Sequence, residues 1–137
     1  MPSPMELELK NVELHAGDRV QVKGKIMHDA ERFQIDLGSD TNNLALHFNP
    51  RFPNDTGEAT LVCNSKDGGC WGAEQREKHL NLQRGSLVKI VLKLMGDMFE
   101  VELPDGKEFQ FPNRHGLDVI TYVRVRGDFK CTCFKIC

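Results

Sequence analysis

The strongest constraint on this chain is a period-two alternation of apolar and polar residues, which recurs in short runs along most of its length. Clear examples are residues 33–37, 44–49, 88–93 and 119–126. Such alternation indicates strands with one buried and one wetted face, whereas stripes of helical period are scarce. Because turn-forming residues separate the runs, the sequence predicts an all-β antiparallel sandwich or barrel.

Two segments make more local predictions. Asp105-Gly106 stands between two alternating runs and predicts a hairpin with a type I′ turn, in which both central residues adopt positive φ. Residues 73–80 are rich in helix formers and, read alone, fit a short helix and a polar strand almost equally well. The choice matters because Glu74 and Arg76 share a face only on a strand.

Length and charge narrow the class of protein. The 137 residues are enough for one ordinary domain, so we expect residues 1–137 to form a single unit. A net charge of −2 argues against a nucleic-acid partner. No apolar run is long enough for a membrane helix, and the first residues do not resemble a secretory signal. We therefore expect synthesis in the cytosol and no direct insertion into a membrane.

The cysteines indicate a reducing compartment rather than a disulfide framework or a metal centre. Their number is odd, so at least one has no partner within the chain, and free thiols are the simplest interpretation. Their spacing does not fit a zinc site, and we expect no metal and no cofactor. Three of them crowd the C-terminus, where we hypothesise that oxidation could cross-link chains or distort the dimer edge, although inert thiols are an equally simple interpretation. The five are Cys63, Cys70, Cys131, Cys133 and Cys137.

The candidate binding residues lie on alternate positions of neighbouring runs. His47, Asn49 and Arg51 face outward together if residues 44–51 form a strand. Asn64 holds a similar position on the next run, and Trp71, the only tryptophan, is flanked by glycines that favour a rim position. Plainer interpretations remain open, since polar residues line the wet side of any half-buried strand and a lone indole is often a core residue.

These side chains suit a sugar. A flat indole covers an apolar C–H face, while a guanidinium, an amide and an imidazole supply directional hydrogen bonds to hydroxyl groups. Such a site rejects an epimer that leaves its groups unpaired, because each unpaired partner costs about 1–3 kcal/mol.

Three linked motifs resemble the signature of the galectins, the β-galactoside-binding lectins. The motifs are His47-Phe48-Asn49-Pro50-Arg51, Val62-Cys63-Asn64 and Trp71-Gly72-Ala73-Glu74-Gln75-Arg76, in that order. The similarity extends along nearly the whole chain and is to the prototype members, which have a single carbohydrate-recognition domain. It implies a two-sheet, antiparallel, jelly-roll-like sandwich with a sugar groove on one concave face, and it implies a strand for residues 73–80.

The resemblance also implies a role for each site residue. His47, Asn49 and Arg51 would hold the axial 4-hydroxyl of galactose. Asn64 and Glu74 would bind the 6-hydroxyl, and Trp71 would stack on the apolar face of the ring. The next sugar, glucose or N-acetylglucosamine, would contact Arg51, Glu74 and Arg76, while Val62 would form part of the groove wall.

Two features depart from close prototype relatives. The loop after the Asn-Pro-Arg motif reads Pro53-Asn54-Asp55-Thr56-Gly57, where relatives often offer a histidine near the sugar. Arg32 stands beside the expected groove, where relatives often have a smaller polar residue. We hypothesise that Arg32 contacts groups beyond galactose, although a solvated surface arginine is an equally simple interpretation.

By the same resemblance, the expected ligands are lactose and N-acetyllactosamine units of glycoproteins and glycolipids, cross-linked by a non-covalent homodimer. The dimer would form through the terminal strands, residues 5–9 and 129–137, which lie at sheet edges. Charges such as Glu6, Glu8 and Lys135 could instead block edge pairing. The resemblance implies both a cytoplasmic and an extracellular location, reached by unconventional export.

Two other functions fit the sequence less well than sugar binding does. A glycosidase needs two carboxylates, one of them a general acid, but the motifs supply only Glu74, and the cations expected beside it favour its charged form. No nucleophile or phosphate-binding motif is present, so we expect no enzymatic activity and no catalytic residue. The other alternative is a protein-interaction sandwich with a vestigial sugar site, against which the intact motifs argue.

Overall fold

The computed structural model describes residues 5–53 and 59–137, and within them all regular secondary structure is β-strand. It follows that no helix in the described part of the chain is available to cross a membrane. The strands are β1 (Met5–Leu14), β2 (Arg19–Ile26), β3 (Phe33–Asp40), β4 (Asn43–Arg51), β5 (Ala59–Asp67), β6 (Cys70–Trp71), β7 (Gln75–Leu80), β8 (Leu87–Leu94), β9 (Met98–Glu102), β10 (Glu108–Pro112), β11 (Ile120–Gly127) and β12 (Phe129–Ile136).

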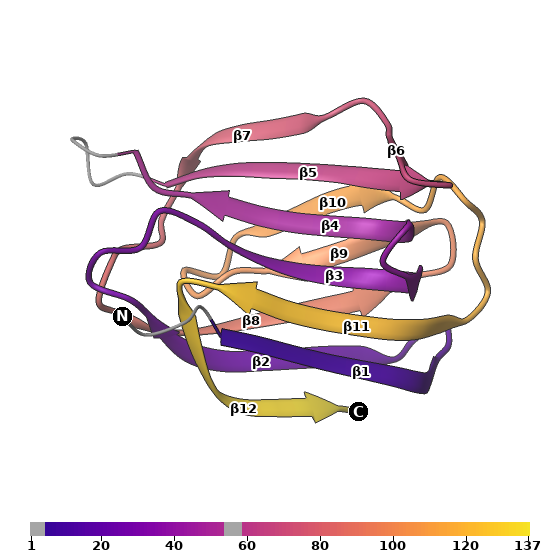
Figure 1. Ribbon diagram of the computed structural model, residues 1–137, viewed down its shortest axis with the longest axis horizontal. Coiled ribbons are helices and arrows are strands. Elements are labelled where there is room, and N and C mark those ends of the chain that lie inside the picture. The colour runs from indigo at the N-terminus through magenta and orange to yellow at the C-terminus, as the bar shows by residue number, and fades with distance from the viewer. Residues whose placement is uncertain (1–4, 54–58) are drawn as a thin grey trace.

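The strands form two antiparallel sheets that pack face to face (Figure 1). A seven-stranded sheet has the order β1-β11-β3-β4-β5-β6, with β7 also paired to β5, and a five-stranded sheet has the order β10-β9-β8-β2-β12. The predicted fold class, an all-β two-sheet antiparallel sandwich, is confirmed. The terminal strands β1 and β12 are edge strands of different sheets and lie on the same side of the sandwich.

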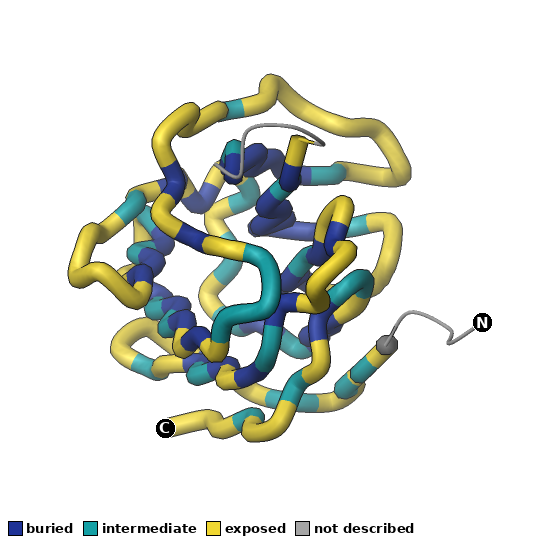
Figure 2. Tube along the Cα trace, turned by 90° about the vertical axis from the view of Figure 1, so that its left-hand side faces the viewer, coloured by how far each residue is buried: buried dark blue, intermediate teal, exposed yellow. Residues whose placement is uncertain are grey.

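Buried residues alternate with more exposed ones along many strands of both sheets (Figure 2), and the buried apolar side chains form the core. The rings of Phe33 and Phe129 stack with their centroids 4.7 Å apart and join β3 of one sheet to β12 of the other. Gly24 permits this packing, because a Cβ there would lie 2.5 Å from the Phe129 ring. The apolar halves of the alternating runs are thereby buried, and their polar halves are left on the outer faces.

The structure settles the two local predictions. Residues 75–80 form strand β7, as the resemblance implies, and Glu74 directly precedes it. The hairpin at Asp105-Gly106 exists between β9 and β10, but the type I′ turn is wrong, since Gly106 has φ 84° while Asp105 does not have a positive φ. Pro104 explains the difference, because its ring fixes a negative φ that suits a type I turn closed by the Gly106 N–H to Leu103 carbonyl bond.

Candidate functional site

The outer face of the seven-stranded sheet contains an open groove of about 480 Å³. Eight of the nine predicted site residues line it, and the ninth, Arg76, contacts one of the eight. The eight are Arg32, His47, Asn49, Arg51, Val62, Asn64, Trp71 and Glu74. The strands therefore bring together the residues that the three motifs place up to 29 positions apart.

Strand register explains this convergence. His47 of β4 is paired with Asn64 of β5 on one side and with Asp36 of β3 on the other. One step along β4 on the same face, Asn49 is opposite Val62, which is itself opposite Arg76 of β7. Paired residues project to the same face of a sheet, so the alternate residues of each run form continuous rows across the groove.

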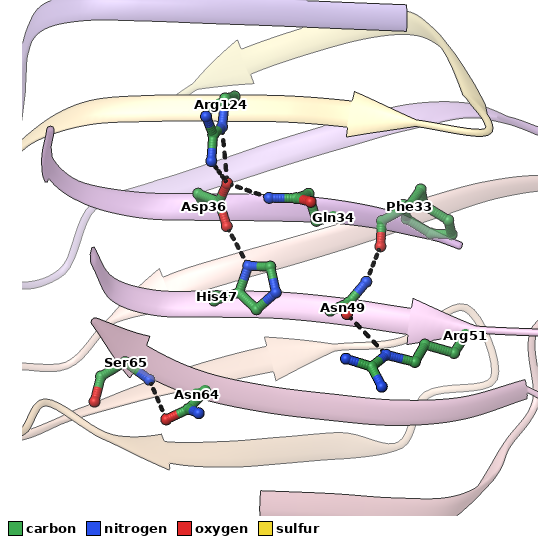
Figure 3. Close-up of polar contacts among 9 residues, drawn as sticks. All are labelled: Phe33, Gln34, Asp36, His47, Asn49, Arg51, Asn64, Ser65 and Arg124. Carbon is green, nitrogen blue, oxygen red and sulfur yellow. Dashed lines mark hydrogen bonds and ion pairs between the residues drawn. The ribbon is translucent and has the colours of Figure 1, made fainter. Parts of the chain in front are cut away.

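Asp36 fixes the orientation and the tautomer of His47 (Figure 3). The His47 Nδ1 atom lies 2.6 Å from Asp36 Oδ1. Since a carboxylate only accepts hydrogen bonds, Nδ1 carries a proton and donates it to Asp36, and Nε2 is the ring nitrogen left for a ligand hydroxyl. The imidazole is nearly buried, so it has little freedom to turn.

The Asp36 carboxylate is itself buried and fully engaged. Its Oδ2 accepts hydrogen bonds from Arg124 Nε at 2.9 Å and from Gln34 Nε2 at 2.7 Å. Burial by itself would raise the pKa of Asp36, but the hydrogen bond and charge of His47, together with Gln34 and Arg124, outweigh it and hold the pKa below its ordinary value. A permanent negative charge therefore lies behind the imidazole.

A second chain of hydrogen bonds orients the amide and the guanidinium on β4. Asn49 Nδ2 donates to the Phe33 carbonyl oxygen at 2.8 Å, and this bond directs its Oδ1 toward the groove. Arg51 Nε donates to that Oδ1 at 3.0 Å, so the guanidinium is held by a side chain of its own strand, which is itself anchored to β3. Both side chains are thus positioned before any ligand arrives.

Trp71 lies at the rim, where half of its surface is exposed, and not in the core. Its ring centroid is 4.7 Å from that of His47, with the planes inclined at 52°. The indole therefore forms one wall of the groove and the imidazole lies beside it. This placement leaves an aromatic face free to cover an apolar ligand surface.

Arg114, which follows β10, holds the segment that carries Trp71. Its guanidinium donates to the Ala73 carbonyl oxygen at 2.8 Å, to Ser65 Oγ at 3.1 Å and to Asn64 Oδ1 at 3.3 Å. Asn64 in turn donates from Nδ2 to the Gly72 carbonyl oxygen at 2.9 Å. These hydrogen bonds hold the Trp71 segment against β5.

Glu74 and Arg76 form the open end of the groove. Arg76 Nη2 lies 3.2 Å from Glu74 Oε1, and both side chains are about half exposed. A pair this exposed contributes little to stability, so its arrangement suits contact with a ligand better than it suits support of the fold.

Sequence reasoning missed Asp36, Arg124 and Arg114. The alternation of residues 33–37 already places Asp36 on the wet face, but its partner Arg124 is 88 positions away, and only the pairing of β3 with β11 joins them. Of the loop 53–57 singled out in the sequence, residues 54–57 lie outside the described part of the chain.

The described residues contain no group of three or more His, Cys, Asp or Glu side chains suited to a metal ion. What they contain is a preoriented row of hydrogen-bonding groups beside an exposed indole, on the outer face of a β-sandwich. A fold and a site of this kind define a lectin, a protein that binds carbohydrate.

Comparison with known proteins gives the family. The family of galactoside-binding lectins matches residues 4–136. Human Galectin-2 is 47% identical over 131 residues, which cover 96% of this chain and 96% of that protein. The solved structure of CG-16, a homodimeric agglutinin from chicken liver, matches this chain with a TM-score of 0.91 and 40% sequence identity. The match covers 97% of this chain and 100% of the CG-16 chain.

A third relative was solved with a ligand. The toad ovary galectin in complex with thio-digalactose is 29% identical to this chain, with a TM-score of 0.90 and 99% of each chain covered. The chain therefore belongs to the galectins, the family of β-galactoside-binding lectins.

Proposed function

We propose that this protein binds the terminal β-galactoside of lactose and N-acetyllactosamine units, on glycoproteins and glycolipids, through the groove of the seven-stranded sheet. The observation that carries the proposal is the fixed row of His47, Asn49 and Arg51 beside the exposed Trp71. In this proposal the three polar groups hold the axial 4-hydroxyl, and Asn64 and Glu74 bind the 6-hydroxyl. Trp71 stacks on the apolar face of galactose.

The remaining site residues are assigned to the groove walls and to the neighbouring sugars. Val62 lies at the floor between Asn49 and Arg76. Arg51, Glu74 and Arg76 contact the reducing sugar, since Arg51 and Glu74 line the groove and Arg76 is paired with Glu74. Arg32, which forms an isolated bridge with Arg51 just before β3, contacts groups beyond galactose.

We infer binding without catalysis. The carboxylates near the groove are Glu74, which pairs with Arg76, and Asp36, which is buried behind His47 with both oxygens bonded. A general acid must release a proton to the leaving oxygen, and Asp36, whose pKa is held below its ordinary value, is not suited to that role. Glu74 alone does not supply the pair of carboxylates that a glycosidase needs. Incubation with lactose should release no glucose above the protein-free rate.

The strength of binding follows from ligand size. A disaccharide of about 23 heavy atoms at roughly 0.3 kcal/mol per atom has a ceiling near 7 kcal/mol, so a Kd of roughly 10 μM to 1 mM is expected for an open, wet groove. Binding this weak becomes useful when two sites are linked in one particle.

We propose that the linkage is a homodimer formed along β1 and β12. Each is paired on one side only, β1 with β11 and β12 with β2, so two sheet edges are available on the same side of the sandwich. The Glu8 carboxylate is less available to repel a second strand at this edge than its sequence position suggests, since it is bonded to the Tyr122 hydroxyl.

The proposed ligands of the protein are glycans that occur on cell surfaces. We therefore further propose that the protein acts outside the cell as well as in the cytoplasm.

Calorimetric titration with lactose and with cellobiose tests the sugar-binding proposal. The two disaccharides differ only in the configuration of the 4-hydroxyl on the terminal sugar, so cellobiose is a matched control. Lactose should bind in the range given above, and cellobiose should bind at least tenfold more weakly, because its equatorial hydroxyl leaves the groups on β4 unpaired. Equal affinities would disprove the assigned site.

Sedimentation equilibrium tests the dimer independently. At micromolar concentration we expect twice the chain mass of 15.5 kDa. A single species with the mass of one chain would refute the dimer and leave the sugar site unaffected.

A further inference from the structure

The outer face of the five-stranded sheet is divided into a basic region and an acidic region. The neighbouring strands β8, β2 and β12 contain seven lysine and arginine residues and no aspartate or glutamate, whereas β9 and β10 contain three glutamates and no lysine or arginine. The cations are Arg19, Lys23, Lys25, Lys89, Lys93, Lys130 and Lys135. The chain as a whole has a formal charge of −2, so composition does not explain this concentration of positive charge.

Strand register sets several of these cations directly opposite one another. The buried residues of β2 and β8 alternate with the cations, which therefore point away from the core. Lys25 is opposite Lys130 of β12, and Lys23 is opposite Lys89 of β8. Like charges in such positions repel each other, so these pairs do not serve the stability of the sheet.

These four lysines also lack an acidic partner. Arg19 and Lys93 differ from them, because they line a small cavity together with the glutamates of β9 and β10. Among the described residues, none of the five remaining cations forms an ion pair. The positive charge is therefore available to a ligand. We call four of these residues the lysine patch: Lys23, Lys25, Lys89 and Lys130.

An exposed apolar side chain adjoins the lysine patch. Leu87 is opposite Lys25, and 77% of its surface is exposed, more than for any other exposed large apolar residue of the described chain. Met27, just after the end of β2, is also exposed, and the Ile26 N–H to Ser86 carbonyl bond keeps this end of β2 beside the start of β8. Folding leaves both apolar surfaces in contact with water.

The combination of lysines with an exposed leucine indicates the chemistry of the partner. Lysine ammonium groups are mobile point charges, which suit many anionic groups better than one group in a fixed geometry. A soluble polyanion such as a sulfated polysaccharide offers no apolar phase to Leu87, whereas the boundary between the headgroups and the acyl chains of a bilayer does. We propose that the lysine patch and Leu87 bind the surface of a membrane that contains anionic phospholipid.

The proposed lipid-binding surface and the sugar groove lie on opposite faces of the sandwich. The groove is on the outer face of the seven-stranded sheet, and the lysine patch is on the outer face of the five-stranded sheet. A protein bound in this way keeps its groove directed away from the bilayer. The inference goes beyond the proposed sugar binding and does not rest on it.

Co-sedimentation of the full chain with lipid vesicles tests the proposal. One set of vesicles is phosphatidylcholine alone, the other contains about 30% phosphatidylserine, and neither contains a glycolipid. We expect partitioning at least about tenfold stronger onto the anionic vesicles, reduced by high salt and unchanged by saturating lactose. Equal partitioning onto the two sets would overturn the proposal. Displacement by lactose would also overturn it, since the sugar groove would then be responsible.

The K23Q/K89Q variant should weaken partitioning onto the anionic vesicles by about tenfold. Its matched control is K78Q/K107Q, which removes two exposed lysine charges outside the five-stranded sheet's lysine patch and should keep the wild-type partitioning. The midpoint of thermal unfolding shows that both variants fold. Wild-type partitioning in K23Q/K89Q would overturn the proposal, and so would an equal loss in the control, which would make net charge alone responsible.

Leu87→Gln distinguishes a bilayer from a soluble polyanion. We expect partitioning of this variant onto the anionic vesicles to be roughly 3- to 10-fold weaker, because the apolar contact is lost, while retention on heparin-agarose stays at the wild-type level. Unchanged partitioning of Leu87→Gln would show that no apolar contact forms and would overturn the proposal. A wild-type protein that is retained by heparin but does not bind the anionic vesicles would have a sulfated polymer as its partner, and the membrane would be excluded.

Discussion

The outer faces of the two sheets are built from the same alternation but treat polar side chains in opposite ways. On the five-stranded sheet they are separate and exposed, as for Lys23, Lys89 and Glu102. On the seven-stranded sheet they are buried and bonded to one another, as in the Asp36–His47 pair. Of the buried polar side chains in the described part of the chain, all but Asn113 lie on strands of the seven-stranded sheet.

The difference shows that the seven-stranded sheet has a fixed binding surface at some cost in stability. Burying charged groups gains little stability even when they are well paired, whereas exposed lysines and glutamates cost almost nothing. In return, the bonded groups keep one orientation before the ligand arrives, and binding does not have to order them. The comparison predicts that equivalent substitutions will have unequal effects on the two sheets.

The largest effect is expected for Asp36→Ala. The change leaves the Arg124 guanidinium buried without its carboxylate, which should lower the free energy of unfolding by about 3–5 kcal/mol. Glu102→Ala on the five-stranded sheet is the control and should stay within about 0.5 kcal/mol. Urea denaturation at pH 7 measures both, and similar losses in the two variants would contradict the comparison.

Acid should reveal the same buried charge in the unchanged protein. The pKa of folded Asp36 lies below the ordinary 3.8, so its stabilising contribution is complete at pH values above 3.8 and is lost as the pH falls through the folded value. The slope of unfolding free energy against pH in this acidic window should be smaller in Asp36→Asn. An unchanged slope would show that the carboxylate titrates alike in the folded and unfolded chains.

The next largest effect is expected for Trp71→Ala, this time on binding. Removal of the half-exposed indole should weaken lactose binding by about 10- to 100-fold, because the apolar face of the sugar loses its cover. The fold should be little affected, since the side chain is not part of the core. Leu87→Ala, at an exposed apolar residue of the five-stranded sheet, should leave the affinity unchanged. Titration calorimetry on both variants makes the comparison.

Within the seven-stranded sheet, the sequence predicted the side chains that face a ligand better than the side chains that hold them in place. The alternation of β4 and the three motifs placed His47, Asn49 and Arg51 on one face, because that information is local. The charges that hold them come from β3 and β11, and the pairing of these strands depends on how distant segments meet. The local pattern therefore predicted the groups that face a ligand but not their support.

The hairpin at residues 103–106 was predicted correctly, but its turn type was wrong for a related reason. Asp105-Gly106 has the composition of a type I′ turn, but Pro104 before it fixes the backbone in the conformation of a type I turn. A rule based on the Asp-Gly dipeptide alone takes no account of the proline that precedes it. Arg114 was missed because three of its acceptors, two of them side chains of β5, lie 41 to 50 positions away.

A smaller effect on binding is expected for Gly72→Ala. A Cβ at this position would lie 2.9 Å from Arg114 Nη1 and 3.1 Å from Ser65 Oγ, so the guanidinium that holds the Trp71 segment has to move. We expect lactose affinity to fall by roughly 3- to 10-fold, which corresponds to about 1 kcal/mol.

A double-mutant cycle identifies the cause. If the clash with Arg114 is responsible, the effects of Gly72→Ala and Arg114→Ala will be markedly less than additive in the combined variant. Additive losses would mean that Gly72 acts through some other contact.

The smallest effect is expected at the opposite end of the seven-stranded sheet, where Tyr122 repeats the pattern of a buried, bonded polar group. Burial raises the pKa of Tyr122 to about 12, and the hydrogen bond from its hydroxyl to the Glu8 carboxylate on β1 contributes to the shift. Because the unfolded chain releases this proton near its ordinary pKa of 10, stability should decline as the pH rises from about 10 to 12.

Tyr122 is the only tyrosine of the chain, so ultraviolet absorbance of the phenolate titrates it directly. The folded protein should give a midpoint near 12, and Glu8→Gln should lower that midpoint while the burial contribution remains. Glu6→Gln is the matched control on the same strand, two residues away, and should not change the midpoint. A midpoint near 10 in the folded protein would mean that this end of the seven-stranded sheet is as open to water as the five-stranded sheet. The contrast between the two outer faces would then apply to the sugar groove alone.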